Sequence, residues 1–291
     1  MSVVAGLFAA GLLLVQGINL NPVMLGDSYA SGTGAGDYSD DLCGRSSQAA
    51  IEDVGRFFGV DVTNAACSGA LVEDLEGTRI IDERRLGSDC STDMVGATAA
   101  ATGNACVITL PPQVESVSGA TDVFVTIGGN NVGFVQIAGI CLIQNSETRC
   151  ANALEEAAET VGDVIDQQRD ALLEIRTIAP DARIHIVPYP RILDVGIDRT
   201  IGSLDVTAEV NDLQEDWEND LRQLADELDD EIGGVFYVET LTPIWEGHGL
   251  GSDDSWILTS GRISGLLHPS EEGWRATGTA YIAHLGLTAS N

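Results

Sequence analysis

Along the chain, short apolar runs alternate with longer segments in which apolar residues recur every three or four positions. The short runs have the length and composition of buried strands and lie at 22–25, 60–65, 121–127, 183–188 and 234–238. The helical spacing occurs at 46–58, 151–179, 207–230 and 271–285. Strands that alternate with helices indicate right-handed crossovers and a parallel sheet covered on both faces. We therefore predict a three-layer α/β domain around a parallel sheet of about five strands.

The stretch from Val72 to Ala105 has a weaker pattern. Its charged first part is compatible with a helix over about Val72 to Leu86. The remainder is rich in Ala, Thr and Gly, and we expect it to be an excursion from the domain. Ser270 precedes the last predicted helix and is placed to cap it. No change of composition and no internal repeat divides residues 18–291, so we predict that they form a single domain.

The 291 residues are 44% hydrophobic, which suits a chain that buries one substantial core. The net charge is −31, and all 14 cationic residues are arginine. Such a surface repels nucleic acid phosphates and anionic membranes. We therefore expect no nucleic acid partner and at most transient contact with a lipid interface. We also expect a monomer. The acidic side chains are most simply explained as a solvated shell whose self-repulsion salt would screen.

Residues 1–17 have the character of an export signal. The run from Val3 to Val15 is almost wholly apolar, too short to span a bilayer comfortably but suited to the apolar region of a signal peptide. Val15 and Gly17 are small residues at the spacing that signal peptidase prefers, which predicts cleavage after Gly17. No positive charge precedes the run, so the alternative is a buried leading segment. We expect a secreted, extracellular protein.

The six cysteines favour the same compartment. None is spaced as Cys-x-x-Cys, and an even number in an exported chain favours disulfides. Sequence alone leaves 15 pairings open. Pairing neighbours along the chain would close loops of 10 to 25 residues, each worth about 3 kcal/mol in the chain-entropy model. These pairs would be Cys43 with Cys67, Cys90 with Cys106, and Cys141 with Cys150.

Three glycine-bearing turns follow predicted strands, at 26–32, 67–70 and 128–131. Because ligands bind at the carboxyl ends of strands in parallel sheets, these turns should meet at one functional edge. Ser28 lies at the first strand-to-helix corner, where a hydroxyl can serve as a nucleophile. The N–H groups of Ser28 and Gly69 and the side-chain amide of Asn130 can donate to an oxyanion. These residues suit acyl transfer from an ester.

Acyl transfer also needs a base, and the chain has four histidines. His185 lies within a predicted strand and His284 within the last helix, so both are expected to be structural. His248 occupies a Gly-rich loop, whose shape it is expected to support. His268 ends a long loop directly before the last helix, where its ring can face the sheet edge, and we expect it to be the base. No cluster of residues has metal-ligand spacing, so neither a metal nor an organic cofactor is expected.

Taken in order, these segments resemble the blocks of the SGNH hydrolases, also called GDSL-type lipases and esterases, over most of the chain after residue 20. Gly26-Asp27-Ser28-Tyr29-Ala30-Ser31-Gly32 is similar to the nucleophile block, and His268-Pro269 to the block that holds the base. Cys67-Ser68-Gly69-Ala70 and Gly128-Gly129-Asn130-Asn131 are similar to the two blocks that supply oxyanion donors. Tyr189-Pro190-Arg191, Trp245-Glu246-Gly247-His248-Gly249 and the paired cysteines resemble the secreted actinobacterial lipase branch. The resemblance implies a flavodoxin-like three-layer fold and a carboxylic ester hydrolase that works through an acyl-enzyme on Ser28.

Two positions depart from the family's pattern. Asn131 stands where the third block usually has an aspartate, and we expect this to alter only local hydrogen bonds. Gly265 stands three residues before His268, where the family usually has the aspartate of the triad. We expect a Ser28–His268 dyad whose histidine is oriented by the Gly265 carbonyl, as in some secreted relatives. The alternative is that Asp253 or Asp254 folds back to supply the carboxylate.

The resemblance leaves the substrate open, because the family acts on short acyl esters, triacylglycerols, phospholipids and acetylated glycans. A lipase or esterase is the leading hypothesis, and a phospholipase or carbohydrate acetylesterase is the alternative. A non-catalytic binding module is an interpretation that Gly265 alone would favour. We expect residues 72–110 and 132–150 to build an acyl pocket. The second segment has apolar residues that suit either an acyl chain or the core: Val132, Phe134, Ile137, Ile140 and Leu142.

Overall fold

A computed structural model gives the structure of the protein and describes residues 20–83, 98–102, 105–194, 196–261 and 265–288. The central sheet has five parallel strands in the order β12-β9-β8-β1-β4. If these five strands are numbered by their order in the chain, they lie across the sheet as 2-1-3-4-5, which is the flavodoxin-like arrangement. The predicted sheet is thereby confirmed. Its strands are β1 (Pro22–Gly26), β4 (Thr63–Asn64), β8 (Asp122–Thr126), β9 (Arg183–Ile186) and β12 (Val235–Tyr237).

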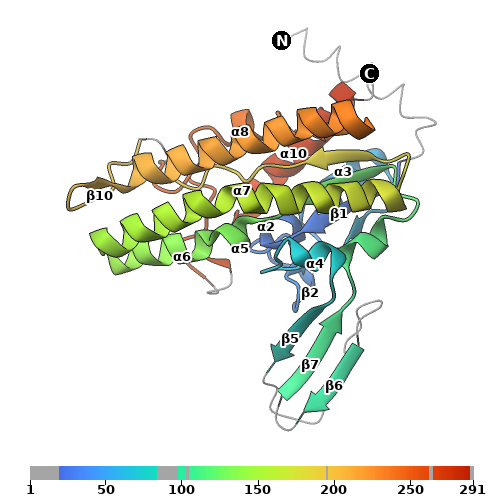
Figure 1. Ribbon diagram of the computed structural model, residues 1–291, viewed down its shortest axis with the longest axis horizontal. Coiled ribbons are helices and arrows are strands. Elements are labelled where there is room, and N and C mark those ends of the chain that lie inside the picture. The colour runs from blue at the N-terminus through green and yellow to red at the C-terminus, as the bar shows by residue number, and fades with distance from the viewer. Residues whose placement is uncertain (1–19, 84–97, 103–104, 195, 262–264, 289–291) are drawn as a thin grey trace.

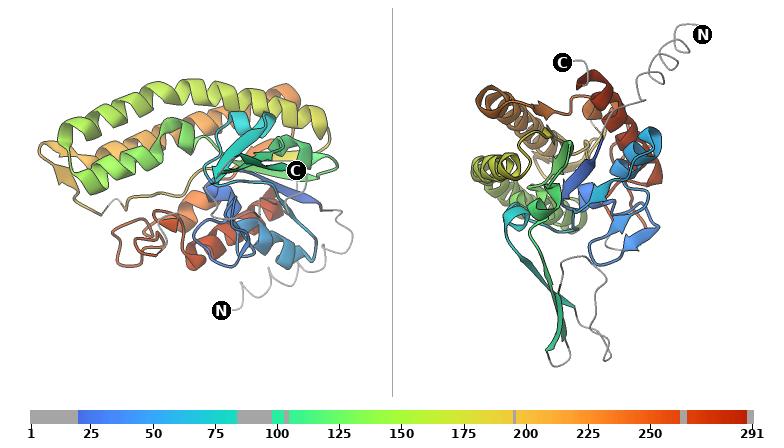
Figure 2. Two further views of the ribbon diagram at one scale, coloured as in Figure 1. Left: turned by 90° about the horizontal axis from the view of Figure 1, so that it is seen from below. Right: turned by 90° about the vertical axis from the view of Figure 1, so that its right-hand side faces the viewer.

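Two pairs of helices cover the two faces of the sheet (Figures 1 and 2). The long helices α7 (Glu147–Ile178) and α8 (Val206–Ile232) lie side by side on one face, and α3 (Ala50–Phe58) and α10 (Glu271–Thr288) contact each other on the opposite face. All four helices were predicted from their spacing, with bounds that differ by a few residues. Ser270 caps α10 as expected, since its Oγ accepts the N–H of Gly273 at 3.3 Å.

The alternation of side chains along β1 and β8 explains the two layers of core. Val23 and Val123 point into the core beneath α7 and α8, whereas Met24 and Phe124 point into the core beneath α3 and α10. All five residues of each strand are buried, and the two strands pair over their whole length, from Pro22 opposite Asp122 to Gly26 opposite Thr126. The turns that follow β1 and β8 therefore begin at the same place on the sheet edge.

Shorter elements complete the domain. Around the carboxyl edge of the sheet lie α2 (Ser28–Ser31), α5 (Gly129–Val132), α6 (Phe134–Ala138) and η2 (Gly139–Gln144). Elsewhere lie β2 (Tyr38–Asp40), β3 (Arg45–Ser46), α4 (Glu73–Glu76), η1 (Gln113–Val117), β10 (Thr200–Ile201), β11 (Leu204–Asp205) and α9 (Leu241–Trp245). Among the described residues, no helix has both the length and the apolar character needed to cross a bilayer.

A three-stranded antiparallel arm projects from the domain (Figure 1). It consists of β5 (Arg79–Glu83), β7 (Ala105–Leu110) and β6 (Thr98–Thr102), with β7 in the middle. The helix expected over residues 72–86 is therefore wrong: α4 has one turn and ends at Gly77, and β5 follows. The β-branched Ile81 pairs with Ile108 across the arm, and such cross-strand packing outweighs a weak helical pattern.

Two of the expected disulfides are present, Cys43–Cys67 and Cys141–Cys150. The first lies where the arm meets the domain, because both cysteines pack with Ile108 and Leu110 in a small separate core cluster. The third expected pair includes Cys90, which lies outside the described residues, as does the expected export signal at 1–17.

Candidate active site

Ser28 is the first residue of α2, two residues after the end of β1, and it is buried. Gly26 is required at this corner: its φ is +133°, and a Cβ there would lie 1.9 Å from the Thr126 carbonyl oxygen. The buried amide of Gln113 fixes the same residue, since it accepts the Gly26 N–H at 2.7 Å and donates to the Gly26 carbonyl at 3.0 Å. The serine is therefore held on a rigid backbone.

Asp27 connects the serine turn to the turn that follows β8. Its carboxylate accepts the N–H of Tyr29 at 2.9 Å and the hydroxyl proton of Tyr189. The Tyr189 oxygen in turn accepts the N–H of Gly129 at 2.9 Å. Asp27 is only 1% exposed, and this burial raises the pKa of its carboxyl to about 7. The sequence marked Tyr189 only by resemblance, because this long-range contact leaves no local pattern.

The expected oxyanion donors gather around the same edge. Gly69 has φ +76° and is exposed, and the Asn130 side-chain amide donates one of its hydrogens to the Ala70 carbonyl at 2.9 Å. This contact places the third block against the second. In the part of the chain that the structure describes, the N–H groups of Ser28 and Gly69 donate to no protein acceptor. Both groups are thus available to a ligand.

Asn131, the residue in place of the usual aspartate, joins the third block to the segment directly after the second block. Its side-chain oxygen accepts the N–H of Val72 at 3.0 Å, and its amide donates to the Glu73 carboxylate at 3.1 Å. An aspartate could accept the Val72 N–H but could not donate to Glu73. The substitution therefore alters local hydrogen bonding.

His268 is held in one tautomer by the main chain. Its Nδ1 lies 3.0 Å from the Leu266 carbonyl oxygen, which can only accept, so Nδ1 carries the proton and Nε2 is left as the basic atom. Leu267 has φ +64°, a strained conformation for a leucine, and the Tyr29 hydroxyl donates to its carbonyl. The His268 ring lies 5.0 Å from the Tyr29 ring, measured between centroids. Burial lowers the pKa of His268 to about 4.

The orienting acceptor is one residue away from the expected one. We expected the Gly265 carbonyl to orient the ring, but the Nδ1 bond is made to Leu266, while the Gly265 carbonyl accepts the backbone N–H of His268 at 3.2 Å. Both carbonyls raise the pKa of His268 against the larger effect of burial. Among the described residues, no carboxylate forms an ion pair with His268. Asp254 is instead 3.3 Å from Nδ1 of His248.

The described chain has no hydrogen bond between Ser28 Oγ and His268. Tyr29 links them: it follows Ser28 in α2 and contacts both the His268 ring and the Leu267 carbonyl. Hydrogen bonds of catalytic groups are often long or poorly aligned in the absence of substrate and tighten only in the complex. The arrangement thus brings the two residues to the same edge without closing the contact between them.

The remaining histidines lie elsewhere. His185 is buried within β9 and His284 within α10, where Nδ1 of His185 and Nε2 of His284 are 2.9 Å apart. His248 stacks on Trp256 at a centroid distance of 3.4 Å. No group of three or more metal-ligating side chains is assembled among the described residues.

An apolar cavity adjoins the third block. The Phe134 ring lies against Gly129 and also packs on Tyr189 and Trp217. From the expected segment 132–150, Val132 and Ile140 are buried in the core rather than in the cavity wall. The wall consists of Phe134, Ile137, Ala138, Cys141, Leu142, Ile192, Leu193, Val210 and Gln214. The cavity wall is therefore mostly apolar, and Phe134 connects it to Gly129 of the third block.

Comparison with protein families gives a match between residues 24–276 and the model of the GDSL-like Lipase/Acylhydrolase family. A lipase of Streptomyces rimosus is 29% identical over an alignment of 189 residues, with 62% of this chain and 56% of that protein covered. Lipase 1 of Streptomyces coelicolor is 29% identical over 184 residues, 60% of this chain and 54% of that protein. The chain thus spans little more than half the length of these two relatives.

Two solved structures show the same fold. A phospholipase A1 from Streptomyces albidoflavus has a TM-score of 0.67 and 23% identity, with 92% of this chain and 98% of that chain covered. The extracellular lipase of Streptomyces rimosus also has a TM-score of 0.67 and 23% identity, with 92% of this chain and 99% of that chain covered. At this level of identity, the likeness supports the three-layer architecture alone.

Proposed function

Because the chain belongs to the GDSL-like lipase/acylhydrolase family, we propose that it is a serine hydrolase of carboxylic esters, with Ser28 as nucleophile and His268 as general base. The observation that carries the proposal is the state of His268. Its Nδ1 proton is fixed by the Leu266 carbonyl and its pKa lies near 4, so Nε2 is an unprotonated base at neutral pH. That base lies beside Tyr29, the neighbour of a buried serine at the edge of the sheet.

In the acylation step, Nε2 of His268 takes the Ser28 hydroxyl proton as Oγ bonds to the ester carbonyl carbon. The carbonyl oxygen becomes an oxyanion that accepts from the N–H groups of Ser28 and Gly69 and from the second amide hydrogen of Asn130. The His268 imidazolium then gives its proton to the departing alcohol as the ester C–O bond breaks, which leaves an acyl group on Oγ.

In the deacylation step, Nε2 of His268 takes a proton from water, and the hydroxide attacks the acyl carbon. The same donors stabilise the second oxyanion, and the proton returns to Ser28 Oγ as the carboxylic acid leaves. A carbonyl oxygen fixes the tautomer as a carboxylate would, but it carries no full charge and stabilises the imidazolium less. A Ser28–His268 dyad therefore keeps the correct orientation of the imidazole but stabilises the imidazolium less than a triad would.

The substrate that we propose has an apolar acyl chain, held in the cavity walled by Phe134, Ile137 and Leu142. This apolar lining favours a lipase or esterase over an acetylesterase, whose acyl group is a single methyl. A phospholipid remains an alternative with the same acyl chain. We propose that the protein acts as a secreted monomer without a cofactor, and the disulfides Cys43–Cys67 and Cys141–Cys150 support an oxidising compartment.

Hydrolysis of p-nitrophenyl esters with acyl chains of increasing length tests this proposal. We expect kcat/KM to rise from acetate to medium chains, and Ser28→Ala to lower kcat by about 10⁶-fold, as loss of a serine nucleophile does elsewhere. Undiminished turnover in Ser28→Ala would contradict the mechanism, and a maximum at acetate would contradict the acyl pocket. Release of fatty acid from phosphatidylcholine vesicles by the same preparation would identify a phospholipase.

The orienting group is tested by Asp253→Asn and Asp254→Asn. If a carbonyl orients His268, each variant should retain kcat to within about threefold, whereas a triad carboxylate contributes about 10⁴-fold. A thousandfold loss of kcat in either variant would contradict the dyad proposal.

A further inference from the structure

We propose that Arg79 is a positioning residue that fixes the Gly69 N–H as an oxyanion donor, an inference that rests on the proposed function. Arg79 is the first residue of β5, at the base of the arm, and pairs with Leu110 of β7. It stands 51 residues after Ser28 in the chain, in a segment that the catalytic blocks do not include.

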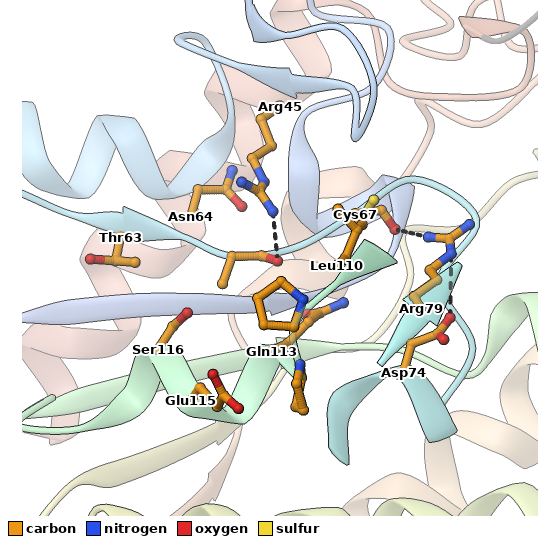
Figure 3. Close-up of a pocket in the computed structure, with 13 residues that line it drawn as sticks. Arg45, Thr63, Asn64, Cys67, Asp74, Arg79, Leu110, Gln113, Glu115 and Ser116 are labelled. Atoms are coloured by element: carbon orange, nitrogen blue, oxygen red, sulfur yellow. Dashed lines mark hydrogen bonds and ion pairs between the residues drawn. The ribbon is translucent and has the colours of Figure 1, made fainter. Parts of the chain in front are cut away.

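The guanidinium of Arg79 binds the backbone of the second block (Figure 3). Its Nη1 donates to the Ser68 carbonyl at 3.0 Å and lies 3.4 Å from the Cys67 carbonyl. The Asp74 carboxylate, 3.5 Å from Nε, holds the other side of the group. The Arg79 and Asp74 side chains are only 21% and 14% exposed, so solvent competes little for these contacts.

The second block is a type II turn. The Ala70 N–H donates to the Cys67 carbonyl at 3.0 Å, which closes a four-residue turn, and Gly69 at its third position has φ +76°. Type II differs from the commoner type I by rotation of the central peptide through about 180°. In this turn, the central peptide joins Ser68 to Gly69. A switch of turn type would therefore reverse the direction of the Gly69 N–H.

Arg79 selects one of these two orientations. No described peptide bond is cis, and in a planar trans peptide the C=O and N–H point in opposite directions. The guanidinium holds the Ser68 oxygen on the arm side, so the Gly69 N–H of the same peptide points away from the arm. The other anchors of the turn do not fix this plane: the Cys43–Cys67 disulfide and the bond from the Ser68 N–H to the Cys43 carbonyl hold the preceding peptide.

The positive charge of Arg79 also acts at the site. It lowers the pKa of Asp27, although burial outweighs it, so its field reaches the nucleophile turn. A Cβ on Gly69 would lie 3.0 Å from Nη2, which shows how closely the guanidinium approaches this peptide. A cation at this distance favours negative charge that develops near Gly69.

Arg45 provides a matched control, because it lines the same pocket and makes the same kinds of contact (Figure 3). It donates to the Ala66 carbonyl at 2.8 Å and to the Ala65 carbonyl at 3.2 Å, and it lies 3.6 Å from the Asp40 carboxylate. Its side chain is 22% exposed. The peptides that it holds precede the turn and supply no oxyanion donor.

The experiment compares Arg79→Gln with Arg45→Gln in the full chain, by steady-state kinetics on the best p-nitrophenyl ester and by thermal unfolding. One oxyanion donor is worth about 10²–10³-fold in kcat, and misorientation removes part of this. We expect Arg79→Gln to lower kcat by about 10–100-fold with KM changed less than about threefold. Arg45→Gln should lower Tm to a similar degree and keep kcat within about threefold. Equal kcat losses in the two variants would overturn the proposal.

A second readout separates orientation from general loosening. A trifluoromethyl ketone with the same acyl chain binds as an oxyanion, so its affinity should fall in Arg79→Gln by the same factor as kcat. Unchanged affinity would overturn the proposal. If Arg79→Gln does not fold, Arg79→Lys replaces it, since lysine keeps the charge but lacks the paired N–H donors of the guanidinium. The lysine variant should lose both kcat and affinity for the ketone, to a smaller extent. The wild-type protein is assayed before any variant. If it hydrolyses no ester, the proposed function itself is overturned.

Discussion

Two titratable side chains contact Tyr29, the buried Asp27 and the partly buried His268, and their pKa values shift in opposite directions. Burial disfavours the charged form of each, so the pKa of Asp27 rises to about 7 and that of His268 falls to about 4. At pH 6 the histidine is therefore neutral, and the carboxyl is largely protonated. The site thus contains a free base and few full charges before substrate arrives.

The shifted histidine predicts an acid limb at unusually low pH. Because His268 must be unprotonated to take the Ser28 proton, kcat/KM should fall as pH drops through about 4 and stay level above it. The measurement is kcat/KM from pH 3 to 8 in a quenched ester assay, with circular dichroism at each pH to show that the protein stays folded. A limb near 6.5, the ordinary value for histidine, would contradict this account.

At the residue scale, the sequence predicted where the proposed catalytic residues lie in the fold, because each sits in a short local motif. Ser28, Gly69, Asn130 and His268 all lie at the predicted edge of the sheet. The carbonyl that orients His268 was assigned one residue too early, since the positive φ of Leu267 decides which carbonyl meets Nδ1. No local sequence pattern predicts a positive φ for a leucine.

At the element scale, the loop that carries His268 depends on close packing against the segment after α2. Gly34 has φ +97°, and a Cβ on it would lie 2.7 Å from the Pro269 carbonyl oxygen and 3.1 Å from the His268 Cβ. Gly36 has φ +80°, but a Cβ there would have no atom within 4 Å. An alanine at either position would therefore meet similar backbone strain, but only at position 34 would it also collide with the loop of His268.

We expect Gly34→Ala and Gly36→Ala each to lose roughly 1–2 kcal/mol of unfolding free energy from the left-handed conformation. Gly34→Ala should in addition displace His268 and lower kcat by at least about 10-fold, as small misplacements of catalytic groups do. Urea unfolding and ester kinetics on both variants make the comparison. Equal kcat in the two variants would show that Gly34 does not position the histidine.

Helix α10 is anchored by a buried chain of polar groups. The Asp122 carboxylate lies 2.7 Å from the Arg183 guanidinium and accepts the Nε2 proton of His185. Because a neutral imidazole has a single N–H, Nδ1 of His185 must accept a hydrogen bond from Nε2 of His284 in α10. Burial lowers the pKa of both histidines, to about 3 for His284. Both are neutral in the folded protein and take up protons on unfolding below about pH 6.5.

The stability that these histidines provide is therefore complete above about pH 6.5 and is lost as pH falls toward 3. His284→Gln keeps a donor for His185 but cannot titrate. We expect the variant to lose less unfolding free energy than the wild type between pH 6.5 and 4, as measured by urea unfolding at each pH. An identical acid loss in both proteins would assign the pH dependence to other groups.

Prediction of elements succeeded where periodicity was long and failed where partners were distant. The spacing in α7 and α8 repeats over many turns, so both helices were found nearly to their ends. An excursion was expected where the arm lies, but its strands were missed, because β5 gains its structure from β7, which follows it only after residue 104. The apolar pattern around Ile80 and Ile81 is too short to predict a strand by itself, since its pairing partner lies far away in the sequence.

At the scale of the whole molecule, the net charge of −31 sets the response to salt. Self-repulsion destabilises the compact state, and ions screen it over distances of about 10 Å at 0.1 M. We expect Tm to rise by several degrees as NaCl increases from about 0.05 M to about 1 M. KCl should give the same rise at equal ionic strength if screening is the cause. A constant or falling Tm would mean that the acidic shell does not limit stability.

The central claim is that Ser28 is a nucleophile activated by His268, and covalent labelling tests it most directly. A fluorophosphonate probe reacts with activated serines, and intact mass followed by peptide mapping locates the label. We predict one label per chain, on Ser28, and loss of labelling in Ser28→Ala. His268→Asn should slow labelling by about 10³-fold or more, whereas His248→Asn should label as fast as the wild type. A label on another residue, or no label on folded wild-type protein, would contradict the account.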